Sequence, residues 1–520
     1  MTLRVAFYNV VRYKAPAAAL SAADAKLEAH ALQRFSRQVG RTRHRCAHRS
    51  CVRRRKVPRT GSSGKLDEIN TLLGGLLGKV LDSGEFEPKL NKTLLLQTAD
   101  ERVLLIGAGK RKEHDFEKAQ QIAGAAVRAL PSICQSATLV LRGDLAPQTQ
   151  GQAVSEGAGI ALLRPDFYKS DRKEPKLERI ELIAGKGDTK AVTRGLEDGQ
   201  VLAEAVNFAR RLADEPSNLM TPTRLAEAAT TVAHGPVTVE VLEREDMERM
   251  GMGSLLGVAK GSDEPPKLIV MRYKAPKKSK TTVALVGKGI TFDTGGISLK
   301  PANHMEEMKT DMSGGASVIG AMRTLAHFRP AVNVLGIVPA TENMPGGHAI
   351  KPGDVLRASN GKTIEVLNTD AEGRLILADG IIYARNHGAT HLVDIATLTG
   401  AIVTALGKIT TGVFGNNQDW VDKLLAAAKR AGEKMWQMPM FQEYADMMKG
   451  DISDLKNISG STEAGSITAA GFLMAFAEDT PWIHLDIAGT ARAGKDLGYL
   501  AKGATGAGLR TMVELLRGLS

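Results

Sequence analysis

The sequence predicts an α/β protein of two domains: a smaller N-terminal α/β domain and a larger C-terminal α/β domain whose central mixed sheet is flanked by helices. Two observations favour this class. Apolar runs of strand length alternate with helical patterns along most of the chain, and this order builds parallel or mixed sheets. The chain also has 520 residues, which is too long for one ordinary hydrophobic core, so we expect more than one domain.

The first segment, residues 1–64, is strongly basic. Residues 1–65 hold 16 lysines and arginines against only Asp24 and Glu28, a balance of +14, so the net charge of +12 leaves the rest of the chain at −2. Because such blocks are usually solvated, we expect a basic, poorly ordered N-terminal extension with one candidate strand over residues 3–11. A targeting peptide, a nucleic-acid-binding tail and a mis-assigned start are alternative interpretations.

The N-terminal α/β domain is expected over residues 65–195. An apolar strand over residues 103–107 is followed by a helical pattern over 116–130 and by a second strand over 137–141. This order of strand, helix and strand favours a parallel arrangement. A long helical pattern follows, and we interpret residues 196–212 as a linker helix between the domains.

The larger C-terminal domain is expected over residues 213–520. Strand and helix patterns alternate through it, as in a sheet that is covered by helices. The candidate strands lie at residues 268–273, 282–286, 332–339, 390–395 and 483–487. The candidate helices lie at residues 314–328, 372–386, 420–431 and 469–477.

The composition argues against several classes of protein. No run of about 18 apolar residues occurs, so we expect no membrane-spanning helix. The three cysteines, Cys46, Cys51 and Cys134, give no disulfide framework and suit a reducing compartment. The spacing of His44, Cys46, His48 and Cys51 fits no common zinc finger. The Gly-x-Ser-x-Gly elbow of many serine hydrolases is absent.

Charged side chains gather in two glycine-containing stretches of the second domain. Residues 286–296 end an apolar strand in a glycine-rich turn that carries Lys288 and Asp293. Residues 368–375 read Asn-Thr-Asp-Ala-Glu-Gly-Arg-Leu and stand before an apolar helical pattern. Ligands of α/β proteins collect at the carboxyl ends of strands, and glycines let the backbone approach a ligand closely. The set indicates a site for two divalent cations, and hence metal-assisted hydrolysis or phosphoryl chemistry.

Simpler interpretations of the same residues stay open at this point. Asp370, Glu372 and Arg374 could cap a helix and form a surface salt bridge. Lys288 could bind a phosphate, although the motif Gly-x-x-x-x-Gly-Lys-Ser/Thr is absent there. The combination of both stretches favours the metal site.

The sequence resembles the leucyl aminopeptidase family, the cytosolic dinuclear metallo-aminopeptidases. The octapeptide at residues 368–375 matches completely, and the stretch Gly-Lys-Gly-Ile-Thr-Phe-Asp at 287–293 matches equally well. Other stretches that look like the family are residues 295–301, 308–315, 465–470 and 482–489. The resemblance covers about residues 65–520 and is strongest from about residue 213 onward, whereas the basic extension departs from it.

The resemblance implies a role for each matching residue. The implied metal ligands are Lys288, Asp293, Asp311, Asp370 and Glu372. Lys300 and Arg374 would be the catalytic side chains that bind no metal. The implied substrate-binding residues are Met308, Thr397, Leu398, Gly400 and Ala488. The implied cofactors are two divalent metal ions per subunit, Mn²⁺ or Zn²⁺, and a bicarbonate at Arg374. Carboxylate ligands with one uncharged amine agree with such ions.

The resemblance also implies an activity. We expect a cytoplasmic, homohexameric aminopeptidase for intracellular peptide turnover, which releases leucine-like residues from peptides with a free N-terminus by attack of a metal-bridging water. Two other hypotheses stay open: a bifunctional DNA-binding regulator that uses the basic extension, and a catalytically silent scaffold. Salt-sensitive binding of duplex DNA would distinguish the regulator.

Overall fold

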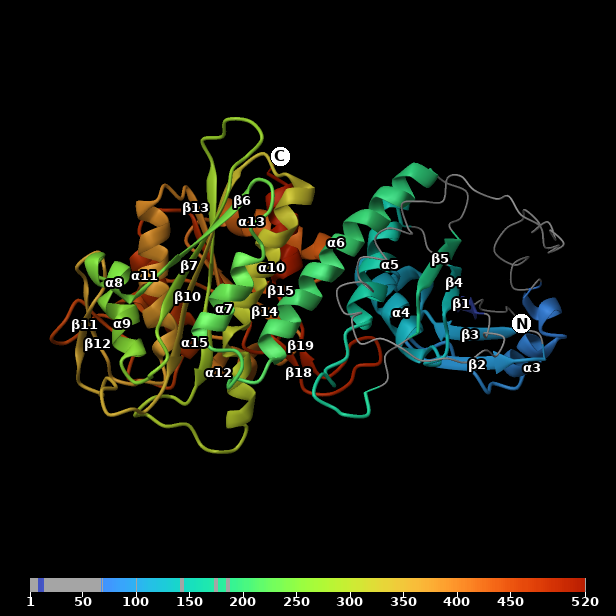
Figure 1. Ribbon diagram of the computed structural model, residues 1–520, viewed down its shortest axis with the longest axis horizontal. Helices are drawn as coiled ribbons and strands as arrows, with labels where there is room; N and C mark the ends of the chain where they lie inside the picture. The colour runs from blue at the N-terminus through green and yellow to red at the C-terminus, as the bar shows by residue number, and fades with distance from the viewer. Residues whose placement is uncertain are drawn as a thin grey trace. The chain divides into compact units, whose positions relative to one another are not determined.

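The computed structural model describes residues 8–13, 67, 69–99, 101–140, 145–172, 176–183 and 188–519. The chain divides into two compact units (Figure 1). The first comprises residues 1–200 with 498–500, and the second comprises residues 201–497 with 501–520. The long helix α6 (Thr189–Asp214) contains the border between the units and extends beyond both ends of the predicted linker helix, 196–212.

The first unit is built on a five-stranded mixed sheet with the strand order β2-β3-β1-β4-β5. The strands are β1 (Tyr8–Tyr13), β2 (Thr93–Gln97), β3 (Arg102–Gly107), β4 (Ser136–Val140) and β5 (Arg179–Ile183). Strand β1 is antiparallel to β3 and β4, whereas β4 and β5 are parallel. Because β1 falls inside residues 1–64, the sheet takes its middle strand from the segment that we expected to be an extension. The rest of that segment, residues 1–7 and 14–64, lies outside the described residues.

Helices complete the first unit. They are α3 (Leu76–Asp82), η1 (Arg111–Glu113), α4 (Phe116–Ala129) and α5 (Pro147–Ala161). Helix α4 begins where it does because the side chain of Asp115 accepts a hydrogen bond from the backbone N–H of Lys118. Helices α4 and α5 approach closely at Gly157, where a Cβ atom would lie 2.1 Å from the carbonyl oxygen of Gln120. Only glycine permits that contact.

The second unit is built on a nine-stranded mixed sheet with the order β15-β14-β17-β13-β8-β10-β7-β6, and β9 pairs with β10. Its strands are β6 (Val237–Leu242), β7 (Lys267–Tyr273), β8 (Thr282–Gly287), β9 (Gly289–Asp293), β10 (Asn333–Asn343), β13 (His391–Ala396), β14 (Thr411–Gly415), β15 (Met435–Gln437) and β17 (Trp482–Asp486). Strands β10, β8, β13 and β17 run parallel, and antiparallel neighbours flank them. The predicted α/β class, with a large mixed sheet flanked by helices, is confirmed.

Helices cover both faces of this sheet (Figure 1). They are α7 (Pro222–Thr230), α8 (Arg244–Arg249), α9 (Gly253–Ala259), η2 (Met305–Met312), α10 (Ser313–Phe328), α11 (Glu372–Asn386), α12 (Gly400–Leu406), α13 (Gln418–Ala431), α14 (Gln442–Asp446), α15 (Gly465–Ala477) and α16 (Leu509–Arg517). Apolar residues of α9, α11 and α15 share one core with side chains of β7, β8 and β10. None of the helices in the described ranges has both the length and the apolar run that crossing a bilayer requires.

Two small sheets lie outside the large one. They are formed by β11 (Val355–Arg357), β12 (Thr363–Glu365) and β16 (Leu455–Lys456), and by β18 (Arg492–Ala493) and β19 (Gly503–Ala504).

The feature that matters most for chemistry is the turn between β8 and β9. Helix α10 begins beside it, because the N–H of Gly315 donates to the carbonyl of Lys288 at 2.8 Å. Helix α11 also begins close to this turn. A Cβ atom on its second residue, Gly373, would lie only 2.7 Å from the Lys288 side chain.

Candidate metal centre

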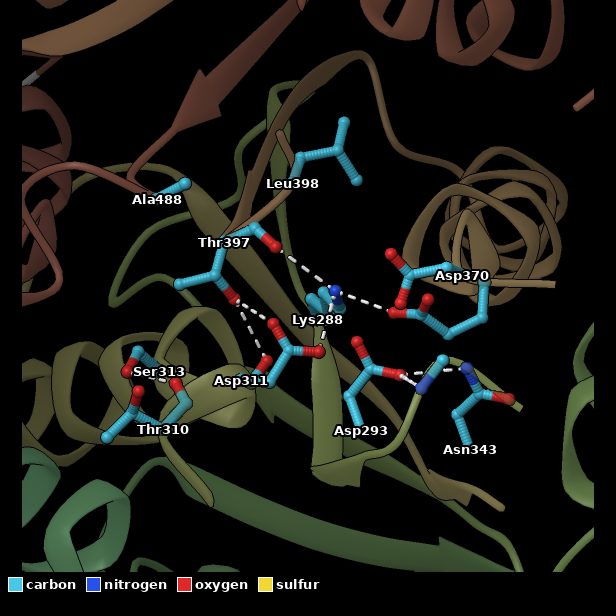
Figure 2. Close-up of polar contacts among 12 residues, drawn as sticks. Lys288, Asp293, Thr310, Asp311, Ser313, Asn343, Asp370, Thr397, Leu398 and Ala488 are labelled. Carbon is cyan, nitrogen blue, oxygen red and sulfur yellow. Dashed lines mark hydrogen bonds and ion pairs between the residues drawn. The ribbon is translucent and has the colours of Figure 1, made fainter. Parts of the chain in front are cut away.

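Four segments of the second unit bring the five expected metal ligands together. Lys288 lies in the turn between β8 and β9, and Asp293 ends β9. Asp311 lies near the end of η2, and Asp370 and Glu372 lie at the start of α11. Oxygen atoms of Asp293, Asp370 and Glu372 all lie within 4.8 Å of one another. Residues that are far apart in the sequence thus form one cluster of acids (Figure 2).

The buried ammonium group of Lys288 joins three of these segments. Its Nζ lies 2.7 Å from Oδ2 of Asp311 and 2.8 Å from Oε1 of Glu372. It also donates to the carbonyl oxygen of Thr397 at 3.1 Å. Burial alone would lower the pKa of Lys288, but the carboxylates of Asp311, Glu372 and Asp293 outweigh burial and raise it. With these carboxylates as its only charged partners in the described structure, the lysine is therefore a cation.

Lys300, one of the two expected catalytic side chains, joins the remaining acids. Its Nζ lies 2.9 Å from Oδ2 of Asp293 and 2.5 Å from Oδ1 of Asp370. The Lys300 side chain is 22 % exposed, whereas that of Lys288 is 3 % exposed. Lys300 thus lies on the open side of the cluster, where a substrate could reach it.

The acids at the centre of the cluster hold protons more tightly than ordinary carboxylates. Burial, followed by the nearby charge of Asp293, raises the pKa of Glu372 to about 8. Burial raises the pKa of Asp311 to about 6 although Lys288 opposes the shift. The pKa of Asp370 is raised in the same way, by burial and then by Asp293. Additional positive charge in the cluster would favour the ionised carboxylates and lower these pKa values.

The donor set fits a pair of divalent cations. Oε2 of Glu372 is buried and has neither a hydrogen bond nor an ion pair among the described residues. When all four are ionised, the carboxylates outnumber the cationic groups of Lys288, Lys300 and Arg374 by one charge, so an added cation would favour the ionised form of Glu372. Carboxylate oxygens are ligands that Mn²⁺ and Zn²⁺ accept, and a lysine can join them once it has lost its proton.

Arg374, the second expected catalytic residue, lies in the first turns of α11. It is buried, and its Nη1 donates to the carbonyl oxygen of Asn457 at 2.7 Å. Its Nε has no hydrogen-bond partner in the described structure. Burial lowers the pKa of Arg374 to about 10, so the guanidinium stays charged at neutral pH. The free Nε can therefore donate to a small anion.

Three of the expected substrate-binding residues, Thr397, Leu398 and Ala488, lie on loops after two central strands. Thr397 follows β13 and donates from Oγ1 to Oδ1 of Asp311 at 2.7 Å. The backbone N–H groups of Leu398 and Ala488 both donate to Oδ1 of Asp486 at 3.2 Å. Figure 2 shows Leu398 on the side of Lys288 that faces away from Asp311 and Asp293. The two other expected residues are Met308, which lies in η2, and Gly400, which begins α12.

Three buried residues that we did not predict organise the centre. Asn343 donates to Asp293, Asn457 accepts from Arg374, and Asp486 holds the loop that carries Leu398. Each is a polar residue at or next to the end of a strand. A polar side chain directly after a buried apolar strand was the signal that could have identified Asn343 and Asp486.

Comparisons with known proteins identify the family of the chain. The catalytic-domain model of the cytosol aminopeptidase family matches residues 207–513, and the N-terminal-domain model of the same family matches residues 57–172. A probable cytosol aminopeptidase of Solibacter usitatus is 49% identical over 440 residues, which cover 83% of this chain and 91% of the relative. A probable cytosol aminopeptidase of Alkaliphilus oremlandii is 45% identical and covers 87% of this chain and 93% of the relative.

Solved structures give the same result. A mutant of tomato leucine aminopeptidase superposes with a TM-score of 0.81 at 34% identity, over 87% of this chain and 89% of that chain. The bottromycin maturation enzyme BotP in complex with Mn superposes with a TM-score of 0.78 at 33% identity, over 85% of this chain and 96% of that chain. Since both family models and full-length relatives match, the chain belongs to the cytosol aminopeptidase family.

Proposed function

We propose that this chain, a metal-dependent aminopeptidase by family, releases leucine-like N-terminal residues from peptides at the cluster around Lys288. The observation that carries the proposal is the convergence of four carboxylates and two lysines, with an unpartnered buried oxygen on Glu372. We assign two divalent cations, Mn²⁺ or Zn²⁺, to this cluster. The proposed ligands are Lys288, Asp293, Asp311, Asp370 and Glu372.

When bound, such cations supply an acidified water at neutral pH and polarise the peptide carbonyl. The protein supplies the remaining parts of the chemistry. Lys300 presents an ammonium group on the exposed side of the cluster, and the carboxylates of Asp293 and Asp370 raise its pKa despite its partial burial, which alone would lower it. It therefore stays charged and can donate to the oxyanion that forms when the carbonyl is attacked. A preorganised donor of this kind contributes several kcal/mol, on the order of 3 kcal/mol.

We assign the second cationic role to Arg374. Its guanidinium is fixed by the carbonyl of Asn457, and its Nε is free to bind an anion. A bicarbonate at this position would be a base for the proton that the attacking water releases. The main-chain carbonyl of Asn457 thus orients the group that holds the base.

The preference for leucine-like residues is the least specific part of the proposal. Leu398 and Ala488 offer apolar surface, and Asp486 ties both of their backbones together. One methylene in an apolar pocket is worth about 1–3 kcal/mol, so we expect a graded preference and not strict selection. The cytoplasm as its location, a homohexamer as its assembly, and the borders of the linker helix at residues 196 and 213 are also parts of this proposal.

The DNA-binding alternative depends on the basic residues between 14 and 64, which lie outside the described residues. It predicts salt-sensitive binding of duplex DNA that disappears when residues 1–64 are deleted. The structure offers no observation that favours it over the peptidase.

The decisive experiment is hydrolysis of a leucine chromophore after chelation and after restoration with Mn²⁺ or Zn²⁺. Asp370→Ala and Glu372→Ala should lose turnover because each removes a ligand. Lys300→Met should bind the ions but lose on the order of 10²–10³-fold in kcat. Glu227→Ala, at an exposed ion pair with Arg224 on α7, is the matched control and should be fully active. Turnover that survives chelation would refute the proposal.

A further inference from the structure

We propose that Asn343 is a positioning residue of the metal centre, and that its side-chain amide sets the separation between Asp293 and Asp370. The inference rests on the proposed function, in which both aspartates are metal ligands. Asn343 itself would bind neither metal nor substrate, and would act through the groups that it holds.

The amide of Asn343 uses both of its N–H bonds at the centre. Asn343 is the last residue of β10 and is 2% exposed. Its Nδ2 donates to Oδ1 of Asp293 at 2.8 Å (Figure 2). The same Nδ2 donates to the carbonyl oxygen of Thr369 at 3.1 Å. Both partners are acceptors without a proton, so only the amide nitrogen can face them. One side chain thus connects a ligand on β9 to the residue that precedes Asp370.

An irregularity in the sheet aims Asn343 at Asp293. Along the β9–β10 ladder, Thr341 pairs with Ile290, but Asn343 pairs with Asp293, so β9 contains one extra residue. In a regular ladder the partner of Asn343 would be Phe292. Such bulges redirect side chains beside functional sites. The bulge therefore has a specific effect, which is to bring the amide opposite the carboxylate.

Further hydrogen bonds fix both ends of the connection. The carbonyl oxygen of Asn343 accepts from the N–H of Thr294 at 3.0 Å and from its Oγ1 at 2.8 Å. Oγ1 of Thr369 donates to the carbonyl of Gly295 at 2.7 Å and accepts from the N–H of Ser298 at 2.8 Å. The loops after β9 and before α11 are therefore joined, and the amide of Asn343 links them to a ligand carboxylate.

The Asn343 amide holds Asp293 and the residue before Asp370 at a fixed separation, which matters because the two aspartates carry like charges. With Oδ1 of Asp293 held by Asn343 and by the N–H of Gly295 at 2.9 Å, its Oδ2 is directed into the cluster, towards Lys300. Loss of a residue that orients a ligand typically costs 10–100-fold in metal affinity. The same range is expected here.

Asn343→Leu tests the inference, because leucine has the same number of heavy side-chain atoms as asparagine but no N–H group. On chelator-treated protein, we expect calorimetric titration with Mn²⁺ to give an apparent Kd that is higher by on the order of 10–100-fold. At saturating Mn²⁺, kcat for a leucine chromophore should stay within a few-fold of wild type, because metal then restores the ligand geometry. Asn343→Ala, which adds no atoms, should give the same loss of affinity.

Asn333→Leu is the matched control. Asn333 begins the same strand, and its amide holds Ala275 and Ser279 at the opposite end of β10. This variant should lose stability but keep the wild-type Kd. An unchanged Kd in both Asn343 variants would overturn the inference. Fewer binding sites at an unchanged Kd would also overturn it, because that result would show only a folding defect. A wild-type protein that binds no Mn²⁺ would instead overturn the proposed function.

Discussion

Glu372→Gln is expected to stabilise the chelator-treated protein while it abolishes metal-dependent turnover. Glu372 is 1% exposed, and burial followed by the charge of Asp293 raises its pKa from 4.5 to about 8. Between these values the folded chain keeps a proton that the unfolded chain has released. Stability therefore falls as the pH rises through this window, and glutamine, which does not titrate, removes that loss.

The size of the effect follows from the width of the window. Each pH unit costs about 1.4 kcal/mol, so the loss between pH 4.5 and pH 7 is about 3 kcal/mol. The variant should therefore have no titration-linked advantage near pH 4.5, about 3 kcal/mol at neutral pH, and a constant advantage above about pH 8. Altered packing at residue 372 would shift stability equally at every pH, so the pH dependence identifies the carboxyl group.

The assay is denaturant unfolding of chelator-treated wild type and Glu372→Gln at about pH 5 and about pH 7.5. Glu227→Gln, on the exposed face of α7, is the control and should follow wild type at both pH values. With Mn²⁺ at about 100 times its Kd, wild type should gain about 2.7 kcal/mol that the variant does not gain. A stability difference that does not change between the two pH values would refute the reasoning.

Two further substitutions probe the surroundings of the cluster. Gly373→Ala would put a Cβ atom 2.7 Å from the side chain of Lys288, and we expect a fall in kcat/KM of about 10²-fold for a leucine chromophore, since small misplacements of reacting groups cost that much. Wild-type activity in this variant would show that Lys288 has room to move. Asp486→Ala should free the backbones of Leu398 and Ala488 and lower the preference for leucine over alanine chromophores by about tenfold, measured as a ratio of kcat/KM. An unchanged ratio would contradict the role of Asp486 in the pocket.

The convergence of Lys288, Asp293, Asp311, Asp370 and Glu372, which we propose as metal ligands, could be predicted from the sequence because each lies in a short stretch of distinctive residues. The stretch at 368–375 holds two of them, and the turn at 286–296 holds two more. Their partners could not be found in this way. The contact between Asn343 and Asp293 joins residues that are 50 positions apart, and it exists only because β9 contains a bulge. No local pattern specifies the register of two strands whose residues are nearly all buried.

The sequence likewise predicted the mainly apolar strands of the second domain but not strand β9. The five strands expected in the second domain all form, because short, mainly apolar runs identify strands that are buried on both faces. Strand β9 (Gly289–Asp293) was interpreted as part of a glycine-rich turn, because Lys288 and the glycines beside it interrupt the apolar pattern. The structure gives these residues a partner in β10, and pairing along the sheet outweighs their weak local preference for a strand.

The glycines around Lys288 explain why a buried lysine can serve this centre at all. A Cβ atom on Gly314 would lie 3.1 Å from the backbone nitrogen of Lys288, and one on Gly315 would lie 3.0 Å from the Lys288 carbonyl oxygen. Together with Gly373, they let the first turns of α10 and α11 close on the β8–β9 turn from both sides. Lys288 is 3% exposed, and among the described residues its ammonium group contacts the oxygens of Asp311, Glu372 and Thr397. A larger residue at 373 would press on the side chain of Lys288, and a larger residue at 314 or 315 would press on its backbone, so each would move the amine relative to Asp311 and Glu372.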